Sequence, residues 1–274
     1  MFFLIGGAQR ILDGNPTPAS AFMDLPADLP TRLARARHVL FFTGAGVSAE
    51  SGIPTFRDAQ SGLWSRFDAT ELATPEAFAR DPALVWGWYE WRRMKVLNAR
   101  PNAAHEAIAA LAAECRVSVV TQNVDDLHER AGSKVCAHLH GHLNRPRCID
   151  CGSPARHPAG SPAVVEDGER IPPPTCMKCG GTVRPGVVWF GEPLPQADWQ
   201  AAMEAIGSAD LLFSVGTSSL VWPAAEMPVW AARRGACVVQ VNPRPTALDE
   251  IAAYNLRGAA GHVLPALLMA ARTA

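Results

Sequence analysis

Short runs of apolar residues that end abruptly in glycine or polar residues recur along this chain. They are HVLFF at 38–42, VSVVTQN at 117–123, LLFSVGTSS at 211–219 and ACVVQVNP at 236–243. Such a run is typical of a strand in a parallel sheet, because that strand is buried on both faces. Stretches with a helical pattern alternate with the runs, at 26–37, 102–114 and 198–209. The alternation predicts an α/β fold with a doubly wound, Rossmann-like parallel sheet, whose ligands bind where strands end.

Two segments interrupt this alternation and predict a smaller lobe. Residues 74–98 are helical in pattern and carry three of the eight tryptophans within six positions, and 144–185 carries two Cys-x-x-Cys pairs. We expect a nucleotide-binding domain, a small domain built from two insertions, and an N-terminal extension. The expected ranges are 26–57, 106–143 and 186–274 for the first, 58–105 and 144–185 for the insertions, and 1–25 for the extension. The cleft between the domains is the expected site.

The charge and the apolar runs of the chain argue against several classes of function. The chain has 274 residues, of which 48% are hydrophobic, and 25 basic residues balance 26 acidic ones, for a net charge of −1. A balanced charge gives no global field for polyanions, so we expect neither nucleic acid nor a membrane surface as a partner. No apolar run approaches the roughly 18 residues that span a bilayer. The first basic residue, Arg10, follows the N-terminal apolar run, which is the reverse of a secretory signal and favours a cytoplasmic protein.

A glycine turn follows the first apolar run, in GAGVSAESGIPTFRD at 44–58. Gly44, Gly46 and Ala49 match G-x-G-x-x-A, which predicts a turn into a helix whose N–H groups meet a pyrophosphate. A tight turn without a ligand is the alternative. No acidic residue closes a second strand about 20 positions later, as the dinucleotide fingerprint requires. The ribose must therefore be held in another way.

Two Cys-x-x-Cys pairs predict a structural zinc ion. Cys148 and Cys151 are followed, after 24 intervening residues, by Cys176 and Cys179. Four thiolates fill a tetrahedral shell and leave no position for water, so this zinc would be structural rather than catalytic. A redox function is the alternative, but the thioredoxin-like context is missing. We expect the remaining cysteines, Cys115, Cys136 and Cys237, to be small core residues.

Amides, a carboxylate and histidines gather in TQNVDDLHERAGS at 121–133 and HLHGHL at 138–143. Gln122, Asn123 and Asp125 suit a ribose or a carboxamide at a strand end. A histidine acts as general base near neutral pH with little tuning. His140 is expected on the next short strand, but His138 and His142 alternate with it, so the pattern alone does not choose among them. His105 fits a helix face and His128 a polar helix position.

These motifs together resemble the sirtuins, the NAD-dependent protein deacylases. GAGVSAESGIPTFRD, TQNVDDLHERAG, HGHL, the paired Cys-x-x-Cys, VVWFGE (187–192), GTSS (216–219) and VNP (241–243) occur in the order and spacing of that family, from about residue 38 to 265. The resemblance implies NAD as co-substrate, one structural zinc ion, and acyl-lysine proteins or peptides as partners. A monomeric enzyme is a separate expectation, which the resemblance leaves open. It also implies that the absence of an acidic residue at the end of the second strand is typical of the family.

The resemblance implies a role for each matching position. His140 would be the general base, with Asn123 and Asp125 as further catalytic residues. In the implied mechanism the amide oxygen of acyl-lysine displaces nicotinamide, His140 helps to deprotonate a ribose hydroxyl, and the acyl group leaves as O-acyl-ADP-ribose. The implied NAD-binding residues are Gly44, Ala45, Gly46, Ala49, Thr55, Phe56, Arg57, Gln122, Asn123, Asp125, Gly216, Thr217, Ser218, Asn242, Pro243 and Ala260. The implied substrate segment is Val188, Trp189, Phe190 and Gly191, which would pair with the peptide backbone.

Tyr89 and Arg92 lie three apart in WGWYEWRR, so they share a helix face. An arginine fork beside a phenol suits a carboxylate, whereas a solvated helix charge is the alternative. The pair matches the Tyr-x-x-Arg of the class III sirtuin branch that prefers succinyl- and malonyl-lysine, which implies desuccinylase and demalonylase activity beside deacetylase activity. Trp86, Trp88 and Trp91 are core residues by spacing, with an acyl pocket as the alternative.

Other functions use the same residues. Mono-ADP-ribosyl transfer or NAD hydrolysis would keep the NAD site and change the acceptor. A non-catalytic NAD-sensing module with a zinc ion would bind NAD without releasing nicotinamide. The sequence does not name the proteins acted on.

Overall fold

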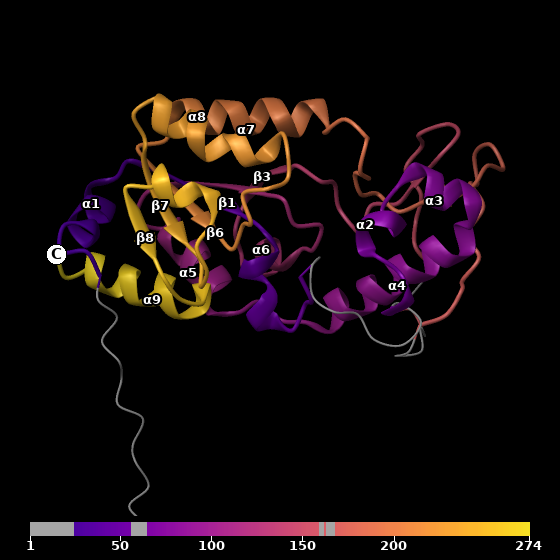
Figure 1. The fold of residues 1–274 in the computed structure, drawn as a ribbon, viewed down its shortest axis with the longest axis horizontal. Helices are drawn as coiled ribbons and strands as arrows, with labels where there is room; N and C mark the ends of the chain where they lie inside the picture. Colours follow the sequence, from indigo (N-terminus) through magenta and orange to yellow (C-terminus); the bar gives the residue numbers. More distant parts are fainter. Residues whose placement is uncertain (1–24, 56–64, 159–161, 163–167) are drawn as a thin grey trace, which may run out of the picture.

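Six parallel strands form the central sheet of the larger part of the molecule (Figure 1). The computed structural model describes residues 25–55, 65–158, 162 and 168–274. The strands are β1 His38–Thr43, β2 Arg116–Thr121, β3 Val135–His138, β6 Leu211–Val215, β7 Cys237–Val241 and β8 Tyr254–Leu256. They lie in the order β3-β2-β1-β6-β7-β8, and every neighbouring pair is parallel. The predicted doubly wound α/β fold is confirmed.

The strand order reverses beside β1, which places a crevice at that point. Strand β1 pairs with β2 on one side and β6 on the other, and Thr43 is in register with both Thr121 and Val215. These three strands therefore end at the same level, so the residues that follow them meet at one edge of the sheet. Open α/β sheets bind ligands at such a reversal.

Helices cover both faces of the sheet (Figure 1). Helices α1 Leu29–Arg35, α5 Ala103–Leu111 and α9 Ala260–Ala271 pack on the face that carries Val39 and Phe41. Helices α7 Gln196–Ser208 and α8 Met227–Arg233 pack on the face that carries Leu40 and Phe42. Burial on both faces is why the strands are continuous apolar runs instead of alternating ones.

Among the described residues, the smaller part holds helices α2, α3 and α4 (Figure 1) and a short two-stranded antiparallel sheet. They are α2 Ala69–Leu72, α3 Pro75–Arg80, α4 Pro82–Asn98, and β4 Arg147–Cys148 paired with β5 Val183–Arg184. The helical segment 74–98 is split because Pro82 begins a new helix, capped by the Asp81 carboxylate, which accepts from the Leu84 N–H at 3.0 Å. The domain ranges given above stay a prediction.

The tryptophans of α4 are core residues. Trp88 and Trp91 pack with Trp189 in one apolar cluster, and Trp86 packs with Cys148 and Cys176 in another. Trp91 also borders the cavity described below. The core positions predicted for the three tryptophans are therefore confirmed.

The remaining short elements are η1 Ala45–Val47, η2 Ala49–Ser51, α6 Leu127–Arg130, η4 Ala224–Glu226 and η5 Ala247–Glu250.

Two local expectations were wrong. Two 3-10 turns, not an α-helix, follow the glycine turn, and Gly52 ends them in the left-handed conformation. His140 is not on a strand, because β3 ends at His138 and Gly141, with φ of 77°, completes a turn.

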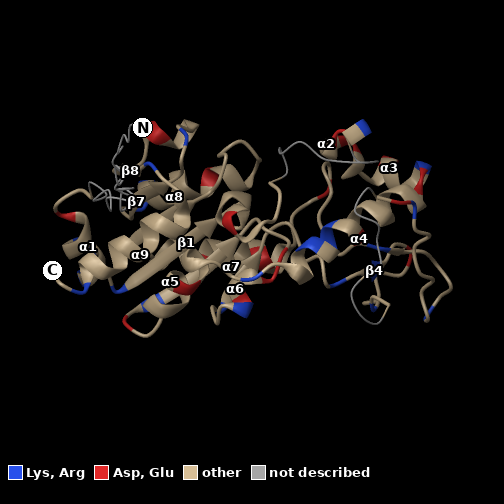
Figure 2. Ribbon diagram, turned by 90° about the horizontal axis from the view of Figure 1, so that it is seen from below, with Lys and Arg blue, Asp and Glu red and all other residues tan. Residues whose placement is uncertain are grey.

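Charges of both signs are interspersed over both parts of the molecule (Figure 2). Among the described residues, no helix is long and apolar enough to cross a membrane. The three isolated cysteines are half-buried: Cys115 and Cys237 pack against the core on one face of the sheet and Cys136 against that on the other.

Candidate active site

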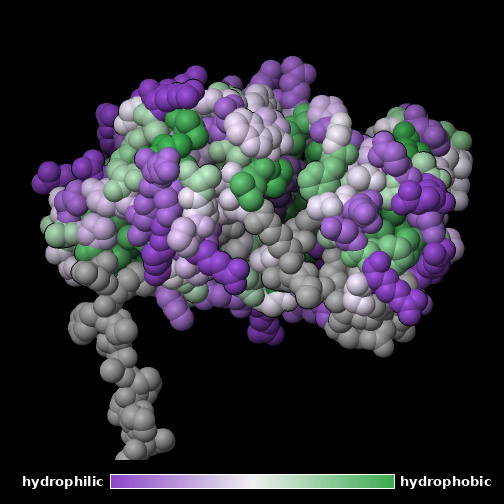
Figure 3. Space-filling view, in the orientation of Figure 1, coloured by the Kyte–Doolittle hydropathy of each residue, from purple (hydrophilic) through white to green (hydrophobic). Residues whose placement is uncertain are grey.

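A cavity of about 1100 Å³ lies where the strand ends of the sheet meet the small lobe. The space-filling view shows a hollow at this junction, with hydrophobic side chains beside it (Figure 3). The cavity is lined by residues that follow β1, β2, β3, β6 and β7, by α4, and by the segment 187–192. The predicted residues that line it are Gly44, Ala45, Gly46, Thr55, Tyr89, Arg92, Gln122, Asn123, Asp125, His140, Val188, Trp189, Phe190, Gly191, Gly216, Thr217, Ser218 and Asn242.

The glycine turn after β1 is packed directly against the turn after β6. The Gly46 N–H donates to the Gly216 carbonyl at 2.9 Å, and a Cβ on Gly46 would lie 2.7 Å from the Gly216 Cα. Glycine is therefore needed at position 46 because the two backbones are in contact there. Room for a pyrophosphate, which the sequence predicts, is a second reason for glycine in this turn.

A buried hydrogen-bonded group joins the glycine segment to the end of β2. Ser48 Oγ donates to Asp125 Oδ2 at 3.0 Å, and Asn123 Nδ2 donates to Ser48 Oγ at 3.1 Å. The Leu127 N–H donates to Asp125 Oδ1 at 3.1 Å. Burial raises the pKa of Asp125, and the hydrogen bonds from Leu127 and Ser48 oppose that rise. The carboxylate and the amide thus have fixed positions on the cavity wall.

His140 has the geometry of a general base. Its Nδ1 lies 3.0 Å from the Gln122 carbonyl oxygen, which can only accept, so Nδ1 carries the proton and Nε2 carries the lone pair. Burial lowers the pKa of His140, and the hydrogen bond to Gln122 opposes this. The ring is therefore neutral at pH 7. Gly141 fixes its turn, because a Cβ there would lie 2.3 Å from the Gly186 carbonyl oxygen.

The two histidines beside His140 have other partners. His138 Nε2 lies 2.6 Å from Glu129 Oε1, and His142 Nδ1 accepts the Asn144 N–H at 3.1 Å. Glu129, His138 and His142 offer three possible ligand atoms within 4.8 Å of one another. However, a neutral His142 whose Nδ1 accepts must carry its proton on Nε2, the other atom that a metal would use. We therefore interpret the group as hydrogen-bonded side chains rather than a metal centre.

Tyr89 and Arg92 line the cavity from the same face of α4. Trp189 Nε1 donates to the Tyr89 hydroxyl oxygen at 3.1 Å, which leaves the Tyr89 proton available to an acceptor. Burial raises the pKa of Tyr89, so the phenol stays protonated. The guanidinium of Arg92 lies 5.1 Å from the centre of the Trp88 ring. Arg92 is thus not a solvated helix charge.

Some predicted residues lie elsewhere. Ala49 and Pro243 are exposed, Ala260 is buried in the core as the first residue of α9, and none of the three lines the cavity. Phe56 and Arg57 lie outside the described residues. The roles expected of these five residues remain predictions.

Sequence reasoning missed Ser48 and misread His128. Ser48 stands inside the quoted glycine motif, and its only signal there is a hydroxyl among small residues. His128 was expected at a polar helix position, but it is 2% exposed and its Nε2 lies 3.0 Å from Thr43 Oγ1. Leu220 and Trp222, both exposed, also line the cavity and were not singled out.

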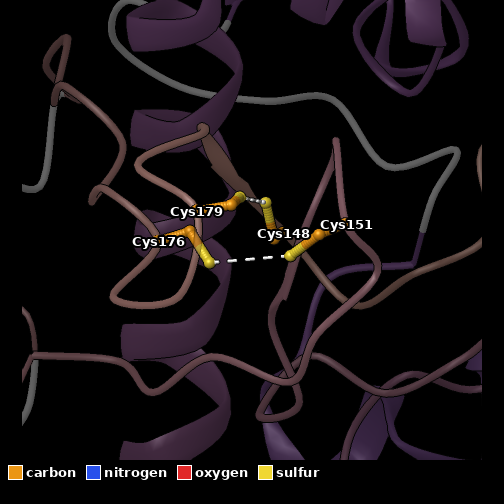
Figure 4. Close-up of side chains that lie close together, drawn as sticks. All are labelled: Cys148, Cys151, Cys176 and Cys179. Carbon is orange, nitrogen blue, oxygen red and sulfur yellow. Dashed lines mark hydrogen bonds between the residues drawn. The ribbon is translucent and has the colours of Figure 1, made fainter.

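The four predicted zinc ligands come together (Figure 4). Cys148 Sγ lies 3.5 Å from Cys179 Sγ, and Cys151 Sγ lies 3.8 Å from Cys176 Sγ. A tetrahedral zinc with Zn–S bonds of about 2.3 Å separates its sulfurs by about 3.8 Å, so the four thiols fit such an ion. Four sulfur ligands leave no open coordination position, which makes the site structural.

Removal of zinc should destabilise the small lobe. Among the described residues the apolar cluster beside the four cysteines is small, consisting of Trp86, Cys148, Cys176 and Val183 with Ala155 and Ile171 packed against it. Because this cluster is small, metal binding has to supply much of the folding free energy there. We expect a strong chelator to lower Tm, and a Cys176→Ser variant to contain less than one zinc per chain. Scanning calorimetry measures Tm and elemental analysis measures the zinc content. A Cys115→Ser variant is the control and should keep its zinc. Unchanged metal content in Cys176→Ser would contradict the assignment.

Comparison with known proteins agrees with this geometry. The Sir2 family model matches residues 44–223. An NAD-dependent protein deacylase of Methylococcus capsulatus is 63% identical over 91% of this chain and 98% of its own length. NAD-dependent protein deacylase 1 of Pseudomonas aeruginosa is 59% identical over 86% and 95% of the two chains.

Solved structures give the same result. The crystal structure of a Sir2 homolog–NAD complex matches with a TM-score of 0.82 and 47% identity, over 91% of this chain and 94% of that chain. A Sir2–p53 peptide–NAD+ structure matches with a TM-score of 0.74 and 29% identity, over 89% and 97%. The fold thus has its counterpart in solved Sir2 structures, and this chain belongs to the Sir2 family, the sirtuins.

Proposed function

We propose that this protein is an NAD-dependent protein lysine deacylase that transfers an acyl group from lysine to ADP-ribose and releases nicotinamide. One observation carries the proposal. His140 is a buried, neutral imidazole whose Nδ1–H is held by the Gln122 carbonyl, and it borders a cavity at the strand-order reversal. Curated relatives with 63% and 59% identity are NAD-dependent protein deacylases, and this supports the same activity here.

The residues around the cavity fit NAD. Bound NAD would supply the ADP-ribosyl group that accepts the acyl group, and nicotinamide as leaving group. Gln122, Asn123 and Asp125 would surround the nicotinamide and its ribose. Buried Asp125 would favour positive charge at the ribose, since a charge interaction is stronger away from water. Gly216, Thr217, Ser218 and Asn242 would hold the adenosine side. Asn242 already has a fixed position, since its Nδ2 donates to the Thr217 carbonyl at 2.7 Å.

His140 Nε2 would receive the proton of a ribose hydroxyl. A neutral imidazole is ready to accept it at pH 7, and the Gln122 carbonyl then stabilises the imidazolium through Nδ1–H. The Val188 N–H donates to the His140 carbonyl at 2.8 Å, so the substrate segment and the base are directly linked. The base would thus act beside the bound acyl-lysine.

Acyl-lysine peptides would lie along the segment 188–191 as an added strand. The N–H groups of Val188, Trp189 and Phe190 already donate within the protein, to His140, Glu192 and Ala73. The pairing would therefore use the Gly191 N–H and carbonyl groups of the segment other than that of Trp189, which accepts the Glu192 N–H. Main-chain pairing discriminates weakly among peptide sequences.

The acyl preference includes succinyl- and malonyl-lysine. Tyr89 offers a neutral O–H donor and Arg92 a guanidinium on the same side of α4. Together they would bind the distal carboxylate of these acyl groups, which an acetyl group lacks. The proposal also includes a monomeric enzyme of the cytoplasm that acts on proteins and binds neither nucleic acid nor membrane.

A panel of acyl-lysine peptides tests the function. Peptides with acetyl-, malonyl-, succinyl- and longer acyl-lysine are incubated with NAD, and released nicotinamide and the acyl product are measured. We expect nicotinamide release only with acylated peptide, in a one-to-one ratio with O-acyl-ADP-ribose. Nicotinamide release without peptide would indicate an NAD hydrolase, protein-bound ADP-ribose a transferase, and NAD binding without release a sensor module.

A further inference from the structure

A chain of buried hydrogen bonds runs from His128 on α6 to Asn123 on the cavity wall. His128 Nε2 lies 3.0 Å from Thr43 Oγ1, Thr43 Oγ1 donates to Thr121 Oγ1 at 2.9 Å, and the Asn123 N–H donates to Thr121 Oγ1 at 3.0 Å. His128, Thr43 and Thr121 are each at most 2% exposed. Beyond Asn123 the chain continues through Ser48 to Asp125.

The donors and acceptors of this chain have one consistent direction. Thr43 gives its proton to Thr121, so it must accept from His128, which places the His128 proton on Nε2. Burial and the neighbouring His105 lower the pKa of His128 to about 3, so the ring stays a neutral donor at physiological pH. Every bond from His128 to the Asn123 main chain thus has a donor and an acceptor.

The chain joins the ends of two strands that carry the cavity. Thr43 is the last residue of β1, directly before the glycine turn, and Thr121 is the last residue of β2, directly before Gln122 and Asn123. His128 and Thr121 themselves do not line the cavity. Substitution of either residue can therefore change NAD binding only by shifting Asn123 or the glycine turn.

We propose that His128 is a positioning residue, which sets the place of Asn123 and Asp125 around NAD through Thr43 and Thr121. The inference rests on the proposed function only for the identity of the ligand. A run of buried hydrogen bonds in which each donor meets an acceptor favours a single arrangement, whereas loss of one member leaves a buried group without a partner. Loss of these hydrogen bonds should therefore loosen the wall of the cavity, whereas His140 should stay in place.

Two isosteric pairs test the proposal. Thr121→Val removes the hydroxyl and keeps the shape, while Thr121→Ser keeps the hydroxyl. His128→Leu removes the donor, while His128→Gln keeps an N–H at a similar reach. We expect Thr121→Val and His128→Leu to raise KM for NAD about tenfold with a smaller change in kcat and an unchanged pH profile, and Thr121→Ser and His128→Gln to recover most of the loss.

The control is a matched histidine at the other end of β1. His38 is buried and bonds Ser118 Oγ at 2.9 Å and Ser208 Oγ at 3.1 Å, far from the cavity. His38→Leu should lower Tm and leave KM for NAD unchanged. Hydrogen exchange of the peptide that contains 121–125 gives a readout without activity, and it should be faster in Thr121→Val alone of the two threonine variants.

Several outcomes would overturn the proposal. They are equal KM values for Thr121→Val and Thr121→Ser, unchanged exchange at 121–125, or a change in KM for His38→Leu equal to that for His128→Leu. Failure of the proposed function has a different signature. In that case the wild-type protein releases no nicotinamide with any acyl peptide, whatever the exchange measurements show.

Discussion

Replacement of His140 by alanine should abolish deacylation while NAD still binds. General base catalysis contributes about 10²–10⁴-fold, and His140 is the cavity-lining histidine proposed to accept the hydroxyl proton at its neutral Nε2. The cavity wall formed by Ser48, Asn123 and Asp125 makes no hydrogen bond to His140, so it should survive the change. Product formation under saturating NAD and peptide measures the first effect, and calorimetric titration with NAD measures the second.

The pH profile gives an independent check on this base. Burial lowers the pKa of His140, so the neutral form persists to lower pH than in a free imidazole with a pKa of about 6.5. We expect kcat/KM to be constant above that value and to fall only as pH drops through the lowered pKa. His262→Ala, at an exposed position of helix α9, is the matched control and should leave the profile unchanged. Retained turnover in His140→Ala would reject the assignment.

A physical reason to prefer His140 over its neighbours comes only from the three-dimensional structure. His138, His140 and His142 alternate along the sequence, and periodicity treats them alike. Their partners differ: the Gln122 carbonyl holds one ring toward the cavity, whereas Glu129 and Asn144 hold the other two elsewhere. Family resemblance predicts His140 as the base, and the hydrogen bonds of the three rings give a physical reason for that prediction.

The sheet was readable because burial on both faces produces continuous apolar runs that stop where polar residues begin. Cysteine spacing likewise predicted the four-thiol cluster, because two short turns fix two pairs of sulfurs. Ser48 and His128 had no such signal. Their roles come from partners 77 and 85 positions away, Asp125 and Thr43, and local patterns do not encode a contact at that separation.

The acyl preference has the second large expected effect. Replacement of Arg92 by methionine should depress desuccinylation much more than deacetylation. A hydrogen bond to a charged group contributes about 1.5–3 kcal/mol, which is about 10–150-fold in kcat/KM. An acetyl group has no carboxylate, so its kcat/KM should change much less. Paired assays on succinyl- and acetyl-lysine versions of one peptide give the ratio directly.

Two further variants distinguish a specific carboxylate site at Tyr89 and Arg92 from a general effect of positive charge in the cavity. Lys95 lines the same cavity with its Nζ 5.7 Å from the centre of the Trp91 ring, so Lys95→Met removes a charge while it keeps Tyr89 and Arg92. It should change the succinyl-to-acetyl ratio less than Arg92→Met. Tyr89→Phe removes the O–H donor and should shift the ratio in the same direction as Arg92→Met, by a smaller factor. Equal losses on both peptides in Arg92→Met would mean that Arg92 holds the helix or the cofactor and does not bind the acyl carboxylate.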